Sequence, residues 1–475
     1  MTGRTHWNVP STREPSPKDP VSMTTRAYDL VIVGAGSGNM LPTEELAGWR
    51  VAVVEKDRFG GTCLNRGCIP SKMLVHTANL AHTIRDAERF GIRTPRAAAD
   101  WPAIRDRIFG RIDPKHDEAV KYRRDHGIDV YLGDAHFVAP KVLQVGGEEL
   151  HADRFVLAAG SRPVVPPVAG LDQVPYFTSD SVMRIETLPE SMVVIGGGYI
   201  AAEMSHIFGA FGTRVTIIGQ ADTLLAEYDL DIRSRFTERY RQRFDLRLSA
   251  KIDNVSMAGN GVRVEFTSSR RSQSVEAEIL LIATGRKPNG DRLGLDAAGI
   301  DLDDDGRVKI DDYYQTNIPG IWSFGDLSNH FDLKHIANAE ARVVRHNVLH
   351  PSDQYKLPFS LIPAAVFAEP EVASVGSTEE ELQEQGRPYI AATSPYSDAA
   401  YGWALEDTTS FLKILADPEN LLILGAHIIG PQASVLIQPL LQAMCLGNTV
   451  EQLAYEVLYI HPSLSEVVAQ ALLAL

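Results

Sequence analysis

Apolar residues along the chain fall into short continuous runs separated by longer mixed stretches. Residues 29–33 and 51–54 form one pair of such runs, and residues 192–195 and 214–218 form a second pair. Continuous apolar runs of four to eight residues are typical of strands that are buried on both faces of a parallel sheet. The pattern predicts an α/β protein with two similar strand–helix–strand units, and the length of 475 residues predicts two to four domains.

A glycine-rich turn follows the first apolar run. Gly34, Gly36 and Gly38 lie between this run and an expected helix, and the second run ends at Glu55. Such a turn lets the backbone approach a pyrophosphate, the helix N-terminus favours its charge, and the acid binds a ribose hydroxyl. The third glycine position of the motif holds Asn39, so we expect helix and strand to lie slightly further apart there.

The same arrangement recurs in the middle of the chain. Gly196 and Gly198 follow the third apolar run, and Ala201 completes the G-x-G-x-x-A form of the motif. Two such turns predict two dinucleotide sites in one chain, with a single decayed duplicate as the alternative. From about Ser352 the character of the sequence changes, which predicts a third domain.

The composition narrows the choice of partners. Hydrophobic residues make up 44% and charged residues 23%, as in ordinary soluble globular proteins, and the net charge of −15 disfavours nucleic acid and anionic membranes. No apolar run approaches the roughly 18 residues of a membrane helix. Residues 1–27 lack the apolar segment of a secretory signal, and we expect a disordered tail or a true start at Met23. Three cysteines without a signal favour the cytoplasm.

Two of the three cysteines, Cys63 and Cys68, are separated by four residues and lie close to the first turn. A pair in this position predicts a redox-active dithiol, in which a thiolate is the reactive species. The alternatives are inert buried thiols or a structural zinc site, but no second cysteine pair or nearby histidine cluster completes a tetrahedron. We therefore predict no metal site. Cys445 lies in an apolar helical run, and we expect it to be buried without chemistry.

Taken together, the motifs resemble the flavoprotein disulfide reductases, the family of glutathione reductase and dihydrolipoamide dehydrogenase. The resemblance covers residues 28–475 and depends on both turns, on the Gly325–Asp326 strand end, on His-Pro-Ser-Leu-Ser-Glu at 461–466, and on Gly-Gly-Thr-Cys-Leu-Asn-Arg-Gly-Cys-Ile-Pro-Ser-Lys at 60–72. Within the family, the chain most resembles the mycothione-reducing branch of actinobacteria, through residues 34–39, 109–114 and 400–408.

The resemblance implies a domain order and two cofactors. It implies an FAD-binding domain at 28–165 and 286–351, an NAD(P)-binding domain at 166–285, and an α+β dimerisation domain at 352–475. Each subunit of a homodimer would hold one FAD and would use NADPH, with NADH as the alternative. The active site would be shared between the subunits.

Roles for individual residues follow from the same resemblance. Cys68 would be the charge-transfer thiolate beside the flavin, and Cys63 the interchange thiol that attacks a substrate disulfide. His461, oriented by Glu466, would serve the cysteines of the other subunit as acid and base. In isolation, such a His–Glu pair is usually a solvated surface pair.

The resemblance also implies the cofactor contacts. Lys72 would lie near flavin N5 and pair with Glu203, unless it is an ordinary lysine on a helix surface. Tyr199 would cover the nicotinamide pocket, unless it only packs. The full set of implied contacts is Gly34, Gly36, Gly38, Glu55, Lys56, Gly61, Thr62, Lys72, Gly160, Asp326, Ala337, Gly196, Gly198, Tyr199, Ile200, Glu203 and Gly285.

Two positions bear on specificity. The stretch around Gln220 has neither the arginine of NADPH-using relatives nor the acid of NADH-using ones, and we favour NADPH because of the family. Glu44 stands where glutathione reductases carry an arginine, which disfavours a dianionic disulfide and suits the neutral mycothione. Tyr401 and Trp403 would stack on a sugar ring or pack at an interface.

We therefore predict NADPH-dependent reduction of mycothione. Dihydrolipoamide dehydrogenase or another reductase of small disulfides is the alternative within the family. A flavin-binding redox sensor or scaffold is the alternative from another class.

Overall fold

The computed structural model describes residues 24–93, 95, 98–358 and 361–475. Residues 24–27, which we expected to belong to the tail, instead begin strand β1 (Thr24–Val33) and pair with β6 (Glu148–Leu157). They are ordered because this pairing satisfies their backbone N–H and C=O groups. The rest of the predicted tail, including Met23, lies outside the described residues.

The first lobe is built on a seven-stranded sheet in the order β3-β2-β1-β6-β5-β4, with β17 beside β6. β1 runs parallel to β2 and β6, and α7 (Lys334–Leu349) packs against one face of the sheet. Every residue of β2 is buried, which explains its unbroken apolar sequence. The remaining strands are β2 (Val51–Glu55), β3 (Asp129–Leu132), β4 (Ala135–Ala139), β5 (Val142–Val145) and β17 (Ile321–Ser323).

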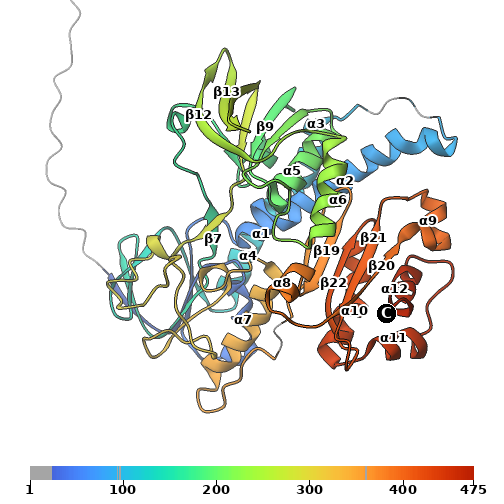
Figure 1. Cartoon of the computed structure of the whole chain (residues 1–475). Helices are drawn as coiled ribbons and strands as arrows, with labels where there is room; N and C mark the ends of the chain where they lie inside the picture. The colour runs from blue at the N-terminus through green and yellow to red at the C-terminus, as the bar shows by residue number, and fades with distance from the viewer. Residues whose placement is uncertain (1–23, 94, 96–97, 359–360) are drawn as a thin grey trace, which may run out of the picture.

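The second lobe has a five-stranded parallel sheet in the order β11-β10-β9-β15-β8, and an antiparallel three-stranded sheet β12-β13-β14. The two-stranded sheet β7 and β16 lies between the first and second lobes (Figure 1). The elements are β7 (Ser161–Pro163), β8 (Phe177–Thr178), β9 (Ser191–Ile195), α5 (Tyr199–Ala210), β10 (Arg214–Ile218), α6 (Leu230–Arg241), β11 (Asp245–Arg247), β12 (Ala250–Ala258), β13 (Gly261–Ser268), β14 (Arg271–Ala277), β15 (Ile279–Ile282) and β16 (Arg286–Pro288).

The third lobe is a five-stranded antiparallel sheet in the order β18-β19-β22-β21-β20, packed against helices α10 and α12. Figure 1 shows it beside the first lobe, with the second lobe above both. Its elements are β18 (Ala364–Val366), β19 (Val372–Gly376), α8 (Glu379–Glu384), β20 (Ile390–Pro395), α9 (Ala400–Leu405), β21 (Phe411–Ala416), β22 (Ile423–Ile429), α10 (Ala433–Leu446), α11 (Val450–Glu456) and α12 (Ser465–Leu473).

Four helices complete the chain between β2 and β3: α1 (Gly61–Arg66), α2 (Cys68–Asp86), α3 (Trp101–Ile112) and α4 (Pro114–Asp125). The buried face of α2 joins a core cluster with α5 of the second lobe and with β18 and β19 of the third. The architecture confirms the predicted α/β fold class with a third, α+β lobe. Among the helices of the described residues, none combines the length and apolar character needed to cross a bilayer.

A buried ion-pair network joins the second and third lobes. Lys413 on β21 is almost fully buried, and its Nζ lies 3.0 Å from Asp229, 2.6 Å from Asp231 and 2.5 Å from Glu379. Asp229 is fully buried beside it. The hydrogen bond from Lys413 lowers the pKa of Glu379. Because Lys413 and Asp229 compensate each other inside the protein, loss of the cation leaves the buried Asp229 carboxylate without its partner.

Replacing Lys413→Met should destabilise the enzyme by about 3–5 kcal/mol, because three carboxylates lose their buried cation. Thermal unfolding of the holoenzyme at pH 7.5 checks this, with the exposed Lys309→Met as the control for loss of one positive charge. A carboxylate whose pKa is lower in the folded state than in the unfolded state stabilises the fold at high pH. The difference in stability between wild type and Lys413→Met should therefore shrink as the pH falls below about 5. A Tm within about 1 °C of wild type at pH 7.5 would contradict the expectation.

Candidate active site

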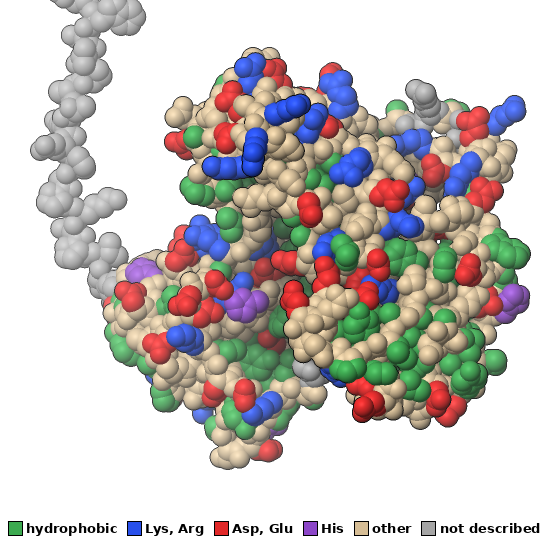
Figure 2. All heavy atoms as spheres, in the orientation of Figure 1, with side chains coloured by type: hydrophobic (Ala, Val, Ile, Leu, Met, Phe, Trp, Pro, Cys, Tyr) green, Lys and Arg blue, Asp and Glu red, His purple; other side chains and the backbone are tan. Residues whose placement is uncertain are grey.

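A cleft of about 2380 Å³ is lined by residues of all three lobes, and both glycine turns and both paired cysteines face it. Figure 2 shows the surface hollowed where the lobes meet. Pockets for drug-sized ligands have volumes of about 300–1,000 Å³. This cleft therefore has room for two dinucleotides and a substrate.

The first glycine turn brings three backbone segments together. A Cβ on Gly34, whose φ is +106°, would lie 2.3 Å from the carbonyl oxygen of Ala158, and a Cβ on Gly61 would lie 2.7 Å from Cα of Gly36. Glu55 is buried at the end of β2 and accepts hydrogen bonds from the N–H groups of Ala35 (2.8 Å) and Asp57 (3.0 Å). Burial raises the pKa of its carboxyl. These glycines leave a backbone cradle, and the acid beside it suits a nucleotide ribose.

Two expectations for this turn are wrong. Only 3₁₀ turns, at Gly38–Met40 and Glu44–Leu46, follow it instead of a helix. Pro42 lacks an N–H and cannot donate the hydrogen bond that would continue a helix, which explains the interruption. Gly38 does not line the cleft but is buried beneath the turn, where a Cβ would lie 3.0 Å from Ile32 and from Ala158.

Arg123 on α4 holds the segment that replaces the helix. Its guanidinium donates to the side-chain oxygen of Asn39 (2.9 Å) and to the carbonyl oxygens of Asn39 (2.5 Å) and Pro42 (3.0 Å). Glu44 is exposed and is not among the residues that line the cleft, so it does not set the charge there.

The second glycine turn keeps its helix. Gly196 has a φ of +136°, and a Cβ there would lie 2.1 Å from the carbonyl oxygen of Ala283. α5 then begins at Tyr199, which lines the cleft, and the space around Gly198 is open. The N-terminus of this helix offers free N–H groups to an anion such as a pyrophosphate.

The two cysteines lie on consecutive helices, Cys63 in α1 and Cys68 at the first position of α2. Both are reduced, and the Cys63 thiol forms a hydrogen bond with Cys68. This bond, aided by the charge of Lys72, lowers the pKa of Cys68 to about 7, whereas the bond and burial raise that of Cys63. The pair therefore carries its first thiolate on Cys68.

Lys72 lies one helical turn beyond Cys68, and its Nζ is 2.6 Å from both carboxylate oxygens of Glu203 on α5. Glu203 is buried and also accepts the N–H of Phe367 at 3.0 Å. The ion pair thus joins the dithiol helix to the helix of the second glycine turn.

A third acid, Asp326, follows β17 and accepts the hydroxyl of Ser161 at 2.6 Å. Of the remaining residues predicted to contact cofactors, every one but Gly38 lines the cleft: Lys56, Thr62, Gly160, Ala337, Ile200 and Gly285. A cradle of glycine backbone, two ribose-type acids and a large cleft fit FAD and a second nucleotide.

His461 and Glu466 lie elsewhere. Nδ1 of His461 is 2.8 Å from Oε1 of Glu466, and the imidazole is 72% exposed. His461 is not among the residues that line the cleft, and Tyr401 and Trp403, exposed on α9, are not among them either. Within one chain, the imidazole and the dithiol are therefore not brought together.

Several lining residues were not predicted. Ser37, Lys251 and Lys334 face the cleft, but no local motif surrounds them. Cys445, expected to be buried, is exposed near the end of α10, because it shares with Gln438 and Leu441 the face of that helix that lines the cleft.

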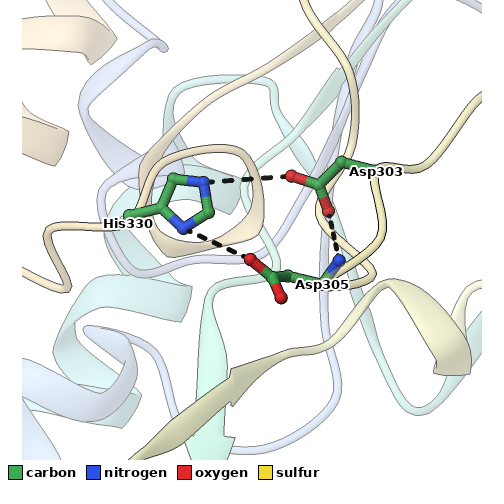
Figure 3. A group of neighbouring side chains, drawn as sticks. All are labelled: Asp303, Asp305 and His330. Atoms are coloured by element: carbon green, nitrogen blue, oxygen red, sulfur yellow. Dashed lines mark hydrogen bonds and ion pairs between the residues drawn. The ribbon is translucent and has the colours of Figure 1, made fainter.

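One further polar group consists of Asp303, Asp305 and His330, of which His330 lines the cleft (Figure 3). His330 lies 3.9 Å from Asp303 and 3.8 Å from Asp305, and its Nδ1 accepts a hydrogen bond from Arg307 at 2.9 Å. Asp303 also accepts the N–H groups of Asp305 and Arg307, as expected of an acid in a tight turn. These contacts account for the arrangement.

Comparison with known proteins agrees with this geometry. Residues 28–341 match the model of the pyridine nucleotide-disulphide oxidoreductases, and residues 362–472 match the dimerisation domain of the same family, which supports a homodimer. The mycothione reductase of Mycobacterium tuberculosis is 43% identical over 94% of this chain and 99% of its own. The dihydrolipoyl dehydrogenase of Bacillus subtilis is 31% identical over 93% of this chain and 95% of its own.

A solved structure agrees as well. The HOCl-induced flavoprotein disulfide reductase RclA of Escherichia coli has a TM-score of 0.84 and 29% identity, over 94% of this chain and 99% of that one. The predicted family and its cofactors, FAD and a nicotinamide nucleotide, are confirmed. The chain belongs to the pyridine nucleotide-disulphide oxidoreductase family and is a flavin-dependent disulfide oxidoreductase.

Proposed function

We propose that this enzyme reduces mycothione to two molecules of mycothiol at the expense of NADPH. The observation that carries the proposal is a reduced dithiol at the meeting point of two nucleotide turns, in a chain 43% identical to a mycothione reductase over nearly its whole length. Because Glu44 is not among the residues that line the cleft, the choice of substrate rests on this identity and not on Glu44.

We further propose the division of labour among the lobes. Residues 28–165 and 286–351 bind FAD, and residues 24–27 extend the first of these segments as the start of β1. Residues 166–285 bind the nicotinamide nucleotide. Residues 352–475 form the dimer interface. The enzyme works in the cytoplasm, where thiols are kept reduced. When bound, FAD supplies the redox chemistry that carries two electrons from NADPH to the Cys63–Cys68 disulfide.

The reduced dithiol then exchanges with the substrate. Cys63, deprotonated, attacks one sulfur of the substrate disulfide, so that a Cys63–substrate disulfide forms and the first mycothiol leaves as a thiolate. The Cys68 thiolate attacks the sulfur of Cys63, and the second mycothiol leaves. The charge of Lys72, which lowers the pKa of Cys68 and does not depend on the Cys63 thiol, supports this role.

Protons are moved by the partner subunit's His461. An exposed imidazole can accept the proton of Cys63 and return protons to the leaving thiolates. Glu466 accepts the Nδ1–H of His461, which leaves Nε2 free to face the thiols. The distance of the pair from its own cleft supports a site shared between subunits.

The preference for NADPH has support at the end of β10. The segment 247–251 runs beside Gln220: Gly219 N–H donates to the carbonyl of Arg247 (3.0 Å), and Ala250 N–H donates to that of Gly219 (3.0 Å). Lys251 is exposed, lines the cleft with Gln220, and forms no ion pair among the described residues. Its ammonium can bind a 2′-phosphate as a point charge.

Steady-state assays with mycothione, glutathione disulfide and lipoamide test the substrate. We expect kcat/KM for mycothione to exceed the other two by about 10²-fold or more, since a site that hydrogen-bonds a substrate's polar groups rejects analogues that lack them. Faster turnover of lipoamide would instead make the enzyme a dihydrolipoamide dehydrogenase.

Subunit mixing tests the shared site. His461→Ala homodimers should lose about 10²–10⁴-fold in activity with the disulfide, and Cys63→Ser homodimers should be inactive. Co-expressed together, the two variants should recover about a quarter of wild-type activity, because half the dimers carry one site with intact Cys63 and His461. A mixture of Cys63→Ser with Cys68→Ser is the control and should stay inactive. No recovery in the first mixture would mean that His461 serves its own chain.

Lys251→Met tests the nucleotide site. The affinity for NADP⁺, measured by calorimetry, should fall by about tenfold, while the affinity for NAD⁺ should be unchanged, because only NADP⁺ carries the 2′-phosphate. Lys309→Met, which removes an exposed lysine outside the cleft, should change neither affinity. Equal losses for both nucleotides would refute a role in phosphate recognition.

A further inference from the structure

Lys334, the first residue of α7, lines the cleft and belongs to none of the motifs discussed above. Its Nζ donates a hydrogen bond to the hydroxyl of Ser37 at 2.8 Å, and that hydroxyl donates to the side-chain oxygen of Asn338 at 3.2 Å. Lys334 forms no ion pair with any described residue. A half-buried lysine is thus held in place by neutral groups, and no carboxylate of the described residues lies within ion-pair distance of its ammonium.

The backbone places this charge beside the dithiol. Ser37 follows Gly36, whose Cα would be only 2.7 Å from a Cβ on Gly61, and Cys63 lies two residues beyond Gly61 in α1. The hydroxyl that anchors Lys334 is therefore next to the first turn of the helix that carries Cys63. The ammonium interacts electrostatically with both thiols, and Asp326 is the carboxylate that acts on it most.

Lys72 cannot supply the same charge. Its ammonium contacts both oxygens of Glu203, so the pair is neutral as a unit, and its effect is on Cys68. The hydrogen bond with Cys68 and burial raise the pKa of Cys63, and Lys334 acts in the opposite direction. Burial lowers the pKa of Lys334, while the two thiols and Asp326 favour its charged form.

We propose that Lys334 is a positioning residue of the disulfide exchange: anchored by Ser37, it provides a positive charge outside any ion pair that stabilises the Cys63 thiolate. The proposal rests on the role of Cys63 as interchange thiol, stated above. In the balanced step, the partner subunit's His461 takes the proton of Cys63, and Lys334 holds the resulting anion. The Cys63–substrate bond then forms as the substrate disulfide breaks and one substrate thiolate leaves.

The test isolates the Cys63 thiol without any substrate. The rate at which iodoacetamide alkylates Cys63 is measured against pH in three holoenzymes. The parent carries Cys68→Ser alone, and the other two carry Cys68→Ser together with Lys334→Met or with Lys334→Arg. We expect the midpoint of the Lys334→Met profile to move up by about one pH unit, a tenfold loss of thiolate below it, because an opposite charge nearby is removed. Lys334→Arg should keep the midpoint of the parent.

Two further variants separate a local charge effect from a structural one. Ser37→Ala keeps the charge but removes its anchor and should give an intermediate midpoint, whereas Lys309→Met should give that of the parent. Flavin absorbance reports whether each variant retains its cofactor. An unchanged midpoint in Lys334→Met, or a loss of flavin without a change in midpoint, would overturn the proposal. Because no mycothione is used, a different physiological substrate would leave this result untouched.

Discussion

The close approach of the Gly36 and Gly61 backbones is the constraint on which the rest of the site depends. A Cβ on Gly61 would lie 2.7 Å from Cα of Gly36, a separation that real Cβ atoms do not show. The contact presses the first nucleotide turn against the helix that carries Cys63. Because the turn must hold a dinucleotide and the helix must present a thiol, the distance between the two groups is set by backbone and not by adjustable side chains. Gly61 is therefore required by this geometry, whereas a Cβ on Gly36 would lie at an ordinary contact distance of 3.8 Å from Cα of Gly61.

Much of this could be predicted from sequence because it is local. The turns at Gly34 and Gly196 follow buried strands and precede acids or helices at fixed spacings, so the pattern itself carries the geometry. The missing helix after the first turn also had a local signal, Pro42, which the glycine motif outweighed in our prediction. The error over Gly38 has the same origin, since without a helix this glycine packs against Ile32 and Ala158 instead of facing a phosphate.

Other parts of the site arise from tertiary contacts that no local pattern reveals. Arg123 comes from α4, more than 80 residues from the turn it holds, and Lys334 reaches Ser37 across nearly 300 residues. The exposure of Cys445 depends on which face of α10 borders the cleft, which an apolar sequence run does not specify. The different charge states of the surroundings of Lys72 and Lys334 also arise from tertiary contacts. Lys72 is neutralised by a buried acid from another lobe, whereas the ammonium of Lys334 bonds the hydroxyl of Ser37 and joins no ion pair with a described residue.

The third lobe connects assembly to chemistry. Around His461 the chain exposes large apolar side chains: Tyr455 is 76% exposed, Leu458 96% and Ile460 74%. Burial of apolar surface contributes about 25 cal/mol per Å², so a partner that covers these side chains gains binding energy next to the proposed acid–base pair. In a two-fold dimer the same surface is used by both subunits, so in the proposed arrangement one imidazole would reach each dithiol. The free energy that holds the subunits together would then also hold His461 in place, and a chain on its own would bind cofactors but lack half of its proton-transfer machinery.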